Sequence, residues 1–190
     1  MNAINILIVG VGGQGTLLAS KLMGKIFIDS GLDVKVSEVH GMSQRGGSVV
    51  TYVRAGEKVF SPVIDKGEAD VIISFEALES ARWLPYLKKD GVVISNTAQI
   101  DPMPVIMGNA KYPENILSAI ENAGIKVVSA DALSLAEQAG SAKAVNIVLL
   151  GIAAKQLGIE KEECLEAIRA TVPQKTIEIN EKAFELGYNL

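Results

Sequence analysis

The chain has 190 residues, of which 48% are hydrophobic and only 5% are aromatic, and its net charge at pH 7 is -4. This composition argues against nucleic-acid binding, which requires a basic surface for phosphates and aromatic faces for bases. The length suits one domain with a large core, so we expect residues 1–190 to form a single domain, with a helical C-terminal part from about residue 131.

The sequence contains one cysteine, Cys164, and one histidine, His40. A single cysteine cannot form an intrachain disulfide, a cysteine-rich zinc site or the thiolate shell of an iron–sulfur cluster. The N-terminus enters a predicted strand without a signal-like basic segment, and the longest apolar run, around residues 147–154, is too short to cross a bilayer. We therefore expect a cytoplasmic protein that holds no metal and contacts no membrane.

The first fifteen residues predict a buried strand followed by a glycine turn, with a helix after it. Residues 4–9 are mostly apolar, and leucines and isoleucines then recur at helical spacing as far as a stop at Gly31. Glycines allow a tight turn and close approach of a ligand, and a helix N-terminus favours an anion such as phosphate. The candidate binding residues here are Gly10, Gly12, Gly13, Gln14, Gly15 and Thr16. Alternatively, the glycines only pack the helix onto the strand.

A second polar, glycine-rich loop, residues 40–47, separates strands predicted at 33–39 and 48–54. About eight residues are fewer than a parallel crossover needs, so these two strands should be antiparallel. The loop follows the carboxyl end of its strand and should share one sheet edge with the glycine turn. Its candidate ligand-binding residues are Ser43, Gln44, Arg45, Gly46 and Gly47. Arg45 is the natural partner for an anion, with a solvated charge or an ion pair to a partner as the alternative.

Three other side chains need an interpretation. His40 titrates near neutrality and is a candidate for proton transfer, although a single histidine without an evident orienting partner is more often a hydrogen-bonding loop residue. Glu38 stands about where a dinucleotide-binding fold places its ribose-binding carboxylate, but the missing helix before the third strand counts against NAD. Cys164 is expected to fill space in the core.

The remainder of the chain predicts more alternating elements and then helices alone. Further strands are expected at residues 70–75, 91–96 and 125–129. Helices are expected at residues 76–84, 114–123, 144–157, 160–170 and 173–186, and another begins after a cap at Asp131. Pro102 and Pro104 exclude a central strand around them. The helix at 144–157 is apolar almost all round, so it is buried in this chain or under a partner. The pattern predicts a Rossmann-like three-layer α/β/α fold with a mostly parallel sheet that carries an antiparallel strand.

Taken together, these residues resemble the 2-oxoacid:ferredoxin oxidoreductase family, in its small gamma-type component. The resemblance is carried by residues 10–16, 38–47 and 67–70, and it extends to about residue 158. The loop His-Gly-Met-Ser-Gln-Arg-Gly-Gly is most similar to the indolepyruvate branch of that family. Gamma components of pyruvate and 2-oxoglutarate enzymes tend to carry a Tyr-Gly version of this loop.

The resemblance implies a subunit that is inactive alone. The complex would decarboxylate an aryl-2-oxoacid such as indolepyruvate with coenzyme A (CoA) and oxidised ferredoxin, giving an aryl-acetyl-CoA, carbon dioxide and reduced ferredoxin. Thiamine diphosphate and the 4Fe–4S clusters would lie on a large alpha subunit. This chain would dock there, close the active-site region and hold the CoA phosphates in its glycine loops.

Other functions stay open at this point. The chain could be the gamma subunit of a pyruvate or 2-oxoisovalerate enzyme, an NAD(P)-dependent oxidoreductase, or a scaffold module without a ligand. An adenylating enzyme of the ubiquitin-activating type has a similar glycine turn, but it usually brings paired cysteines that this chain lacks. The isolated chain could also form a homodimer.

Overall fold

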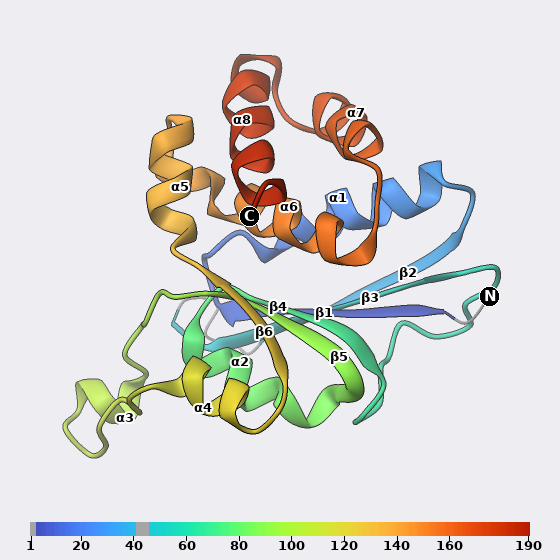
Figure 1. Cartoon of the computed structure of the whole chain (residues 1–190). Helices are drawn as coiled ribbons and strands as arrows, with labels where there is room; N and C mark the ends of the chain where they lie inside the picture. Colours follow the sequence, from blue (N-terminus) through green and yellow to red (C-terminus); the bar gives the residue numbers. More distant parts are fainter. Residues whose placement is uncertain (1–2, 41–45) are drawn as a thin grey trace.

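The computed structural model describes residues 3–40 and 46–190. A six-stranded sheet in the order β2-β3-β1-β4-β5-β6 runs through the middle of the molecule (Figure 1). Its strands are β1 (Ile4–Val11), β2 (Asp33–His40), β3 (Ser48–Gly56), β4 (Ala69–Ser74), β5 (Leu87–Asn96) and β6 (Lys126–Ala130). β3 is antiparallel to both β1 and β2, whereas β1, β4, β5 and β6 pair in parallel. The predicted antiparallel pairing of the second and third strands is therefore confirmed.

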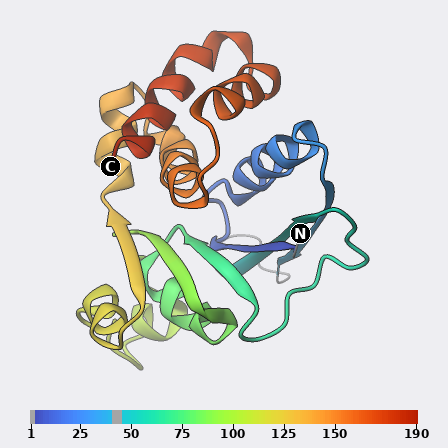
Figure 2. The ribbon, with the colours of Figure 1, turned by 45° about the vertical axis from the view of Figure 1, so that its right-hand side comes forward.

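Helices cover both faces of the sheet, as Figures 1 and 2 show. One layer contains α1 (Thr16–Asp29), α5 (Ala132–Ala139), α6 (Val145–Leu157), α7 (Lys161–Thr171) and α8 (Ile177–Tyr188). The opposite face carries α2 (Ala77–Trp83), α3 (Met103–Ile106) and α4 (Ile116–Asn122). This is the predicted three-layer arrangement with a helical C-terminal region. In the described parts of the chain, no helix combines the length and the apolar character that crossing a membrane requires.

The alternation of side chains along β1 divides the core between the two layers. Ile6 and Ile8 face the C-terminal helices, whereas Leu7 and Val9 face the layer of α2, and all four are fully buried. The larger cluster lies under the C-terminal helices, where Cys164 is also fully buried, so its predicted role as core filler is confirmed.

Helix α6 runs through the centre of the larger layer, between the sheet and α8. Nine of its residues are buried. The apolar surface of this helix is therefore covered within this chain, and it needs no partner to cover it. The crossing with α8 is close because Gly151 and Gly187 meet there. A Cβ on Gly187 would lie 2.0 Å from the carbonyl oxygen of Val148, so neither helix could approach the other as closely with larger residues. The start of α6 lies beside the glycine turn, where Asn146 Nδ2 donates to the carbonyl oxygen of Gly15 at 3.3 Å.

The observed boundaries differ most from the predicted ones at β5 and at the proline-rich segment. β5 begins at Leu87, four positions before the predicted strand at residues 91–96, because Leu87 pairs with Ala69 across an irregular register. The stretch that contains Pro102 and Pro104 forms the short helix α3, which starts directly after Pro102. Proline is tolerated at the start of a helix because the first N–H groups have no intrahelical partner there.

Candidate functional site

The crevice at the carboxyl ends of β1 and β4 lies where the connections of the sheet diverge. β1 continues into α1 on one face, and its parallel neighbour β4 continues into α2 on the opposite face. In open α/β sheets such a switch point forms the usual ligand crevice. The predicted glycine turn, residues 10–15, lies on one side of this crevice.

The side chain of Gln14 bridges the two strands at the base of the crevice. Its Oε1 accepts a hydrogen bond from the backbone N–H of Val11 at 2.7 Å, and its Nε2 donates to the carbonyl oxygen of Phe75 at 3.1 Å. Gly10 leaves room for this amide, since a Cβ there would lie 2.8 Å from Gln14 Oε1. Gln14 thus has a structural role, and its contact with a ligand stays a prediction.

Helix α1 starts directly after the turn without a capping side chain. Gly15 is its N-cap, in a left-handed conformation at φ +87°, and makes no side-chain hydrogen bond to the helix. The first N–H groups of a helix lack intrahelical partners, so an uncapped start of this kind suits an anion.

The two glycine loops meet, as the sequence predicts. The backbone N–H of Gly12 donates to the carbonyl oxygen of Gly47 at 2.9 Å, and Val11 pairs with Ser48 across β1 and β3. Gly46 and Gly47 therefore lie beside the turn. Ser43, Gln44 and Arg45 lie outside the described residues, so their proposed roles stay predictions. His40 ends β2, where its backbone pairs with Val49.

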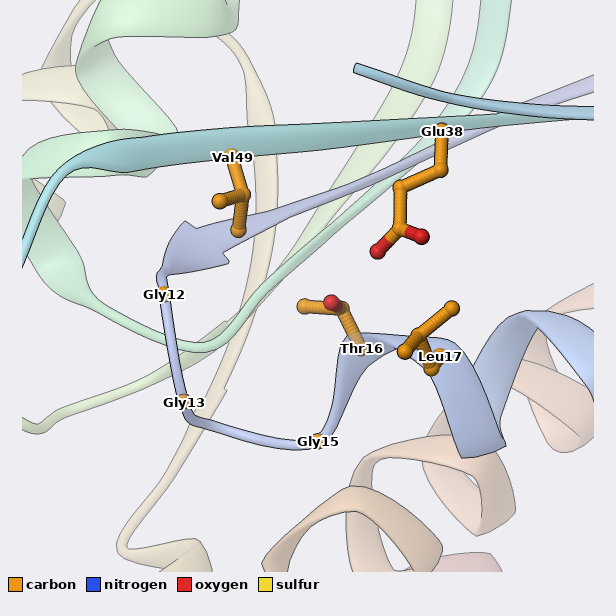
Figure 3. A pocket seen from close by; sticks show the side chains of 7 residues that line it. All are labelled: Gly12, Gly13, Gly15, Thr16, Leu17, Glu38 and Val49. Atoms are coloured by element: carbon orange, nitrogen blue, oxygen red, sulfur yellow. The ribbon is translucent and has the colours of Figure 1, made fainter. Parts of the chain in front are cut away.

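A first hollow lies between the turn and the strands β2 and β3. It has a volume of about 350 Å³ and is lined by Gly12, Gly13, Gly15, Thr16, Leu17, Glu38 and Val49. Figure 3 shows the Glu38 carboxylate pointing from its strand toward the first turn of α1, with Thr16 and Leu17 opposite. We call this the Glu38 hollow. A carboxylate in this position suits a ligand hydroxyl or N–H group better than a phosphate.

A second hollow lies on the opposite side of the same turn, and sequence reasoning missed it. Its volume is about 490 Å³, and its lining is Gly13, Gln14, Gly15, Asn96, Ala98, Leu133, Ala142, Lys143 and Val145. We call this the Lys143 hollow. The sequence signal that could have found it is Lys143 directly before a strongly apolar helix, because a helix start is a place where anions bind.

Buried carboxylates support the crevice from the α2 side. Glu76, 1% exposed, accepts hydrogen bonds from the backbone N–H of Glu79 at 2.9 Å and of Ile100 at 3.1 Å, and from the hydroxyl of Tyr112. Burial, together with this carboxylate, raises the pKa of Tyr112 above its ordinary value. These contacts satisfy the Glu76 side chain and fix the start of α2.

Glu79 anchors the end of the second loop in the same way. It is 4% exposed, accepts from the hydroxyl of Ser48, and pairs with Arg82 Nε at 2.9 Å. Because Ser48 directly follows Gly47, this contact holds the carboxyl end of the loop against α2. No group of three or more potential metal-ligating side chains occurs among the described residues.

The sequence of this chain matches one known protein family over almost its whole length. The family described as pyruvate ferredoxin/flavodoxin oxidoreductase matches residues 5–190. The chain belongs to this family. The predicted resemblance to 2-oxoacid oxidoreductases is thereby confirmed.

Within the pyruvate ferredoxin/flavodoxin oxidoreductase family, two similar proteins are indolepyruvate oxidoreductase subunits IorB. The one from Thermococcus kodakarensis is 46% identical, over 98% of this chain and 95% of the relative. The one from Pyrococcus horikoshii is 45% identical, over the same shares of both chains. The common gamma subunit of the pyruvate and ketoisovalerate oxidoreductases of Pyrococcus abyssi is 29% identical, over 92% of this chain and 89% of the relative.

Two solved structures share the fold of this chain. Pyruvate oxidoreductase subunit PORC from Thermotoga maritima matches with a TM-score of 0.74 at 21% identity, over 100% of this chain and 97% of that one. 2-Oxoglutarate:ferredoxin oxidoreductase from Magnetococcus marinus also matches with a TM-score of 0.74, at 18% identity, over 100% of this chain and 32% of that one. The two solved structures therefore have the same fold as this chain.

Proposed function

We propose that this chain is the small subunit of an indolepyruvate oxidoreductase. The observation that carries the proposal is the 46% identity to an IorB subunit over 98% of this chain and 95% of that relative. Residues 1–190 would form one gamma-type domain, since the family match extends from residue 5 to residue 190. The assembled enzyme would work in the cytoplasm.

The proposed reaction is oxidative decarboxylation of an aryl-2-oxoacid with CoA and oxidised ferredoxin. Its products would be an aryl-acetyl-CoA, carbon dioxide and reduced ferredoxin. A 4Fe–4S cluster needs four thiolates, and this chain has one buried cysteine, so its residues do not fit a cluster. We assign the clusters and thiamine diphosphate to the large alpha subunit, on which this chain would dock to close the active-site region.

The glycine turn is the proposed contact for the phosphate groups of CoA. Two features support this assignment: the uncapped start of α1 and the backbone of Gly13 and Gly15, which lines hollows on both sides of the turn. Arg45, Ser43 and Gln44 would add donors from the second loop. None of these residues is assigned a catalytic role, and His40 stays a candidate for proton transfer only.

The test is to co-express this chain with the large subunit from the same organism and purify the complex. We expect CoA-dependent ferredoxin reduction with indolepyruvate and phenylpyruvate, and much slower turnover of pyruvate. A complex that prefers pyruvate or 2-oxoisovalerate would contradict the aryl assignment. It would instead favour the second candidate, a common gamma subunit, which the 29% identity to the Pyrococcus abyssi protein supports.

An NAD(P)-dependent activity is the other candidate, and the position of Glu38 favours it. The carboxylate points into a hollow beside a glycine turn, where a ribose hydroxyl could bind. Against it, β3 lies between β1 and β2, which is not the strand order of a dinucleotide-binding half. Calorimetric titration of the chain with NADH distinguishes the candidates, because saturable micromolar binding would favour the nucleotide.

A further inference from the structure

The start of α6 places one polar side chain against the glycine turn. Asn146 is the one polar residue among the nine buried residues of α6, and it is 5% exposed. Its Nδ2 donates a hydrogen bond to the carbonyl oxygen of Gly15 at 3.3 Å, across 131 positions of the sequence. The approach is close, since a Cβ at position 15 would lie 3.1 Å from Nδ2. Asn146 thus joins the helical C-terminal region to the residue that begins α1.

Two other contacts hold the turn, and both come from the sheet. The side chain of Gln14 bonds to the backbone of Val11 and Phe75, and the N–H of Gly12 donates to the carbonyl oxygen of Gly47 at 2.9 Å. Among the hydrogen bonds of the described residues, the one from Asn146 alone links the turn to the C-terminal helices. The sheet therefore holds the first part of the turn, and Asn146 holds its end.

Asparagine is unfavourable for stability at position 146. Its Oδ1 is buried and has no hydrogen-bond partner within the parts of the chain that the structure describes. A buried acceptor without a partner costs more than one long neutral hydrogen bond contributes. A water molecule in the cavity of about 190 Å³ that Asn146 lines would meet this acceptor only at an entropic cost. A leucine of similar shape would avoid both costs, so a requirement other than stability accounts for the asparagine.

The carbonyl oxygen of Gly15 does not need Asn146 in order to be hydrogen-bonded. It also accepts from the backbone N–H of Leu18 at 3.2 Å, in the first turn of α1. The bond from Asn146 therefore adds little to the satisfaction of this carbonyl group. What it adds is a fixed position for Gly15 relative to α6.

We propose that Asn146 is a positioning residue for the glycine turn. Its amide fixes the carbonyl oxygen of Gly15 and thereby orients the first backbone N–H groups of α1 for the ligand. The identity of that ligand as CoA rests on the proposed function. Asn146 acts through Gly15 and has no catalytic role. Without the amide, the sheet contacts keep the turn folded, but its end is less fixed.

The test compares Asn146→Leu with Asn180→Leu in the assembled enzyme. Both variants replace an asparagine that lines the cavity of about 190 Å³, but Asn180 donates to the carbonyl oxygen of Thr176 at 2.7 Å and does not contact the glycine turn. Loss of one neutral hydrogen bond predicts that the KM for CoA rises about fivefold in Asn146→Leu. We expect kcat and the KM for the oxoacid to stay unchanged, and Asn180→Leu to keep the wild-type KM for CoA. A KM for CoA within twofold of wild type in Asn146→Leu, or an equal rise in both variants, would overturn the inference.

Two measurements without ligand distinguish positioning from a purely structural role of Asn146. The Tm of Asn146→Leu should equal or exceed that of wild type, because leucine removes the buried acceptor that lacks a partner. Amide hydrogen exchange in the full chain should become about fivefold faster at Leu18, whose N–H donates to the carbonyl oxygen that Asn146 fixes. A Tm below that of wild type, or unchanged exchange at Leu18, would overturn the inference.

Failure of the proposed function gives a different result. The assembled wild-type enzyme would then show no CoA-dependent turnover of aryl-pyruvates. Failure of the present inference leaves that wild-type turnover intact and removes only the difference between Asn146→Leu and Asn180→Leu.

Discussion

Replacing Gly151 with alanine should destabilise the protein, because α6 and α8 cross at this glycine. A Cβ at position 151 would lie 2.3 Å from the carbonyl oxygen of Phe184 and 2.8 Å from the backbone N of Tyr188. Both obstacles are backbone atoms, so no side-chain rotation can relieve the contact. α8 would have to move away from α6 by roughly 0.7 Å or more to reach the 3.0 Å that real Cβ contacts keep.

The size of the effect follows from two opposing contributions. Overpacking of a well-packed core costs about 1–3 kcal/mol, and a displaced helix backbone belongs at the upper end of that range. Alanine in a helix interior gains up to about 1 kcal/mol over glycine. The free energy of unfolding should therefore fall by about 2 kcal/mol, which lowers the Tm of a domain of this size by about 4–8 °C.

The matched control is Gly24→Ala, which makes the same change inside α1. There a Cβ would lie 3.6 Å from Val36 Cγ2 and 3.8 Å from Val34 Cγ1, which are ordinary contacts. This variant should keep the propensity gain of about 1 kcal/mol, and its Tm should rise by about 2–4 °C. Thermal unfolding followed by circular dichroism measures both variants. Equal changes in Tm for the two would refute the close crossing of α6 and α8.

Three further predictions concern the crevice and the core. Gln14→Ala removes both hydrogen bonds that join Val11 to Phe75, so urea unfolding should show a loss of about 2 kcal/mol, and an unchanged midpoint would contradict the bridge. The raised pKa of Tyr112 means that above about pH 10 the folded state keeps a proton that the unfolded state loses. The unfolding free energy should therefore fall as the pH rises past that value, with a shallower slope in Tyr112→Phe; identical slopes would contradict the burial of this hydroxyl. Burial raises the pKa of Cys164 to about 12, with a smaller contribution from Glu163. The native protein should therefore resist a thiol reagent near neutral pH until it is unfolded, and rapid labelling of native protein would contradict this.

The order of strands and helices could be predicted because its signals are local. Apolar runs, a glycine turn, and a loop too short for a crossover all lie in contiguous segments, and they led to the correct layers and to the antiparallel β3. The meeting of Gly12 with Gly47 also followed from local rules, since both loops follow strands that run in the same direction.

The rest of the site depends on contacts between residues distant in the sequence. Asn96, Leu133 and Lys143 come from different elements and share a hollow only after the helical region folds over the sheet. The sequence predicts Gln14 as a ligand-binding residue, but it gives no sign that the amide also joins two strands, because Phe75 comes beside the turn only in the folded sheet. The contact between Glu79 and Ser48 also joins residues that are distant in the sequence, since Ser48 lies on β3 and Glu79 on α2.

We propose that this chain completes an enzyme whose electron-carrying groups belong to another subunit. The most direct measurement compares indolepyruvate-dependent ferredoxin reduction by the large subunit alone, by this chain alone, and by the two together. We predict CoA-dependent turnover only in the mixture, with a rate that rises until the two chains are present in the ratio of the complex. Full turnover by the large subunit without this chain would contradict the claim.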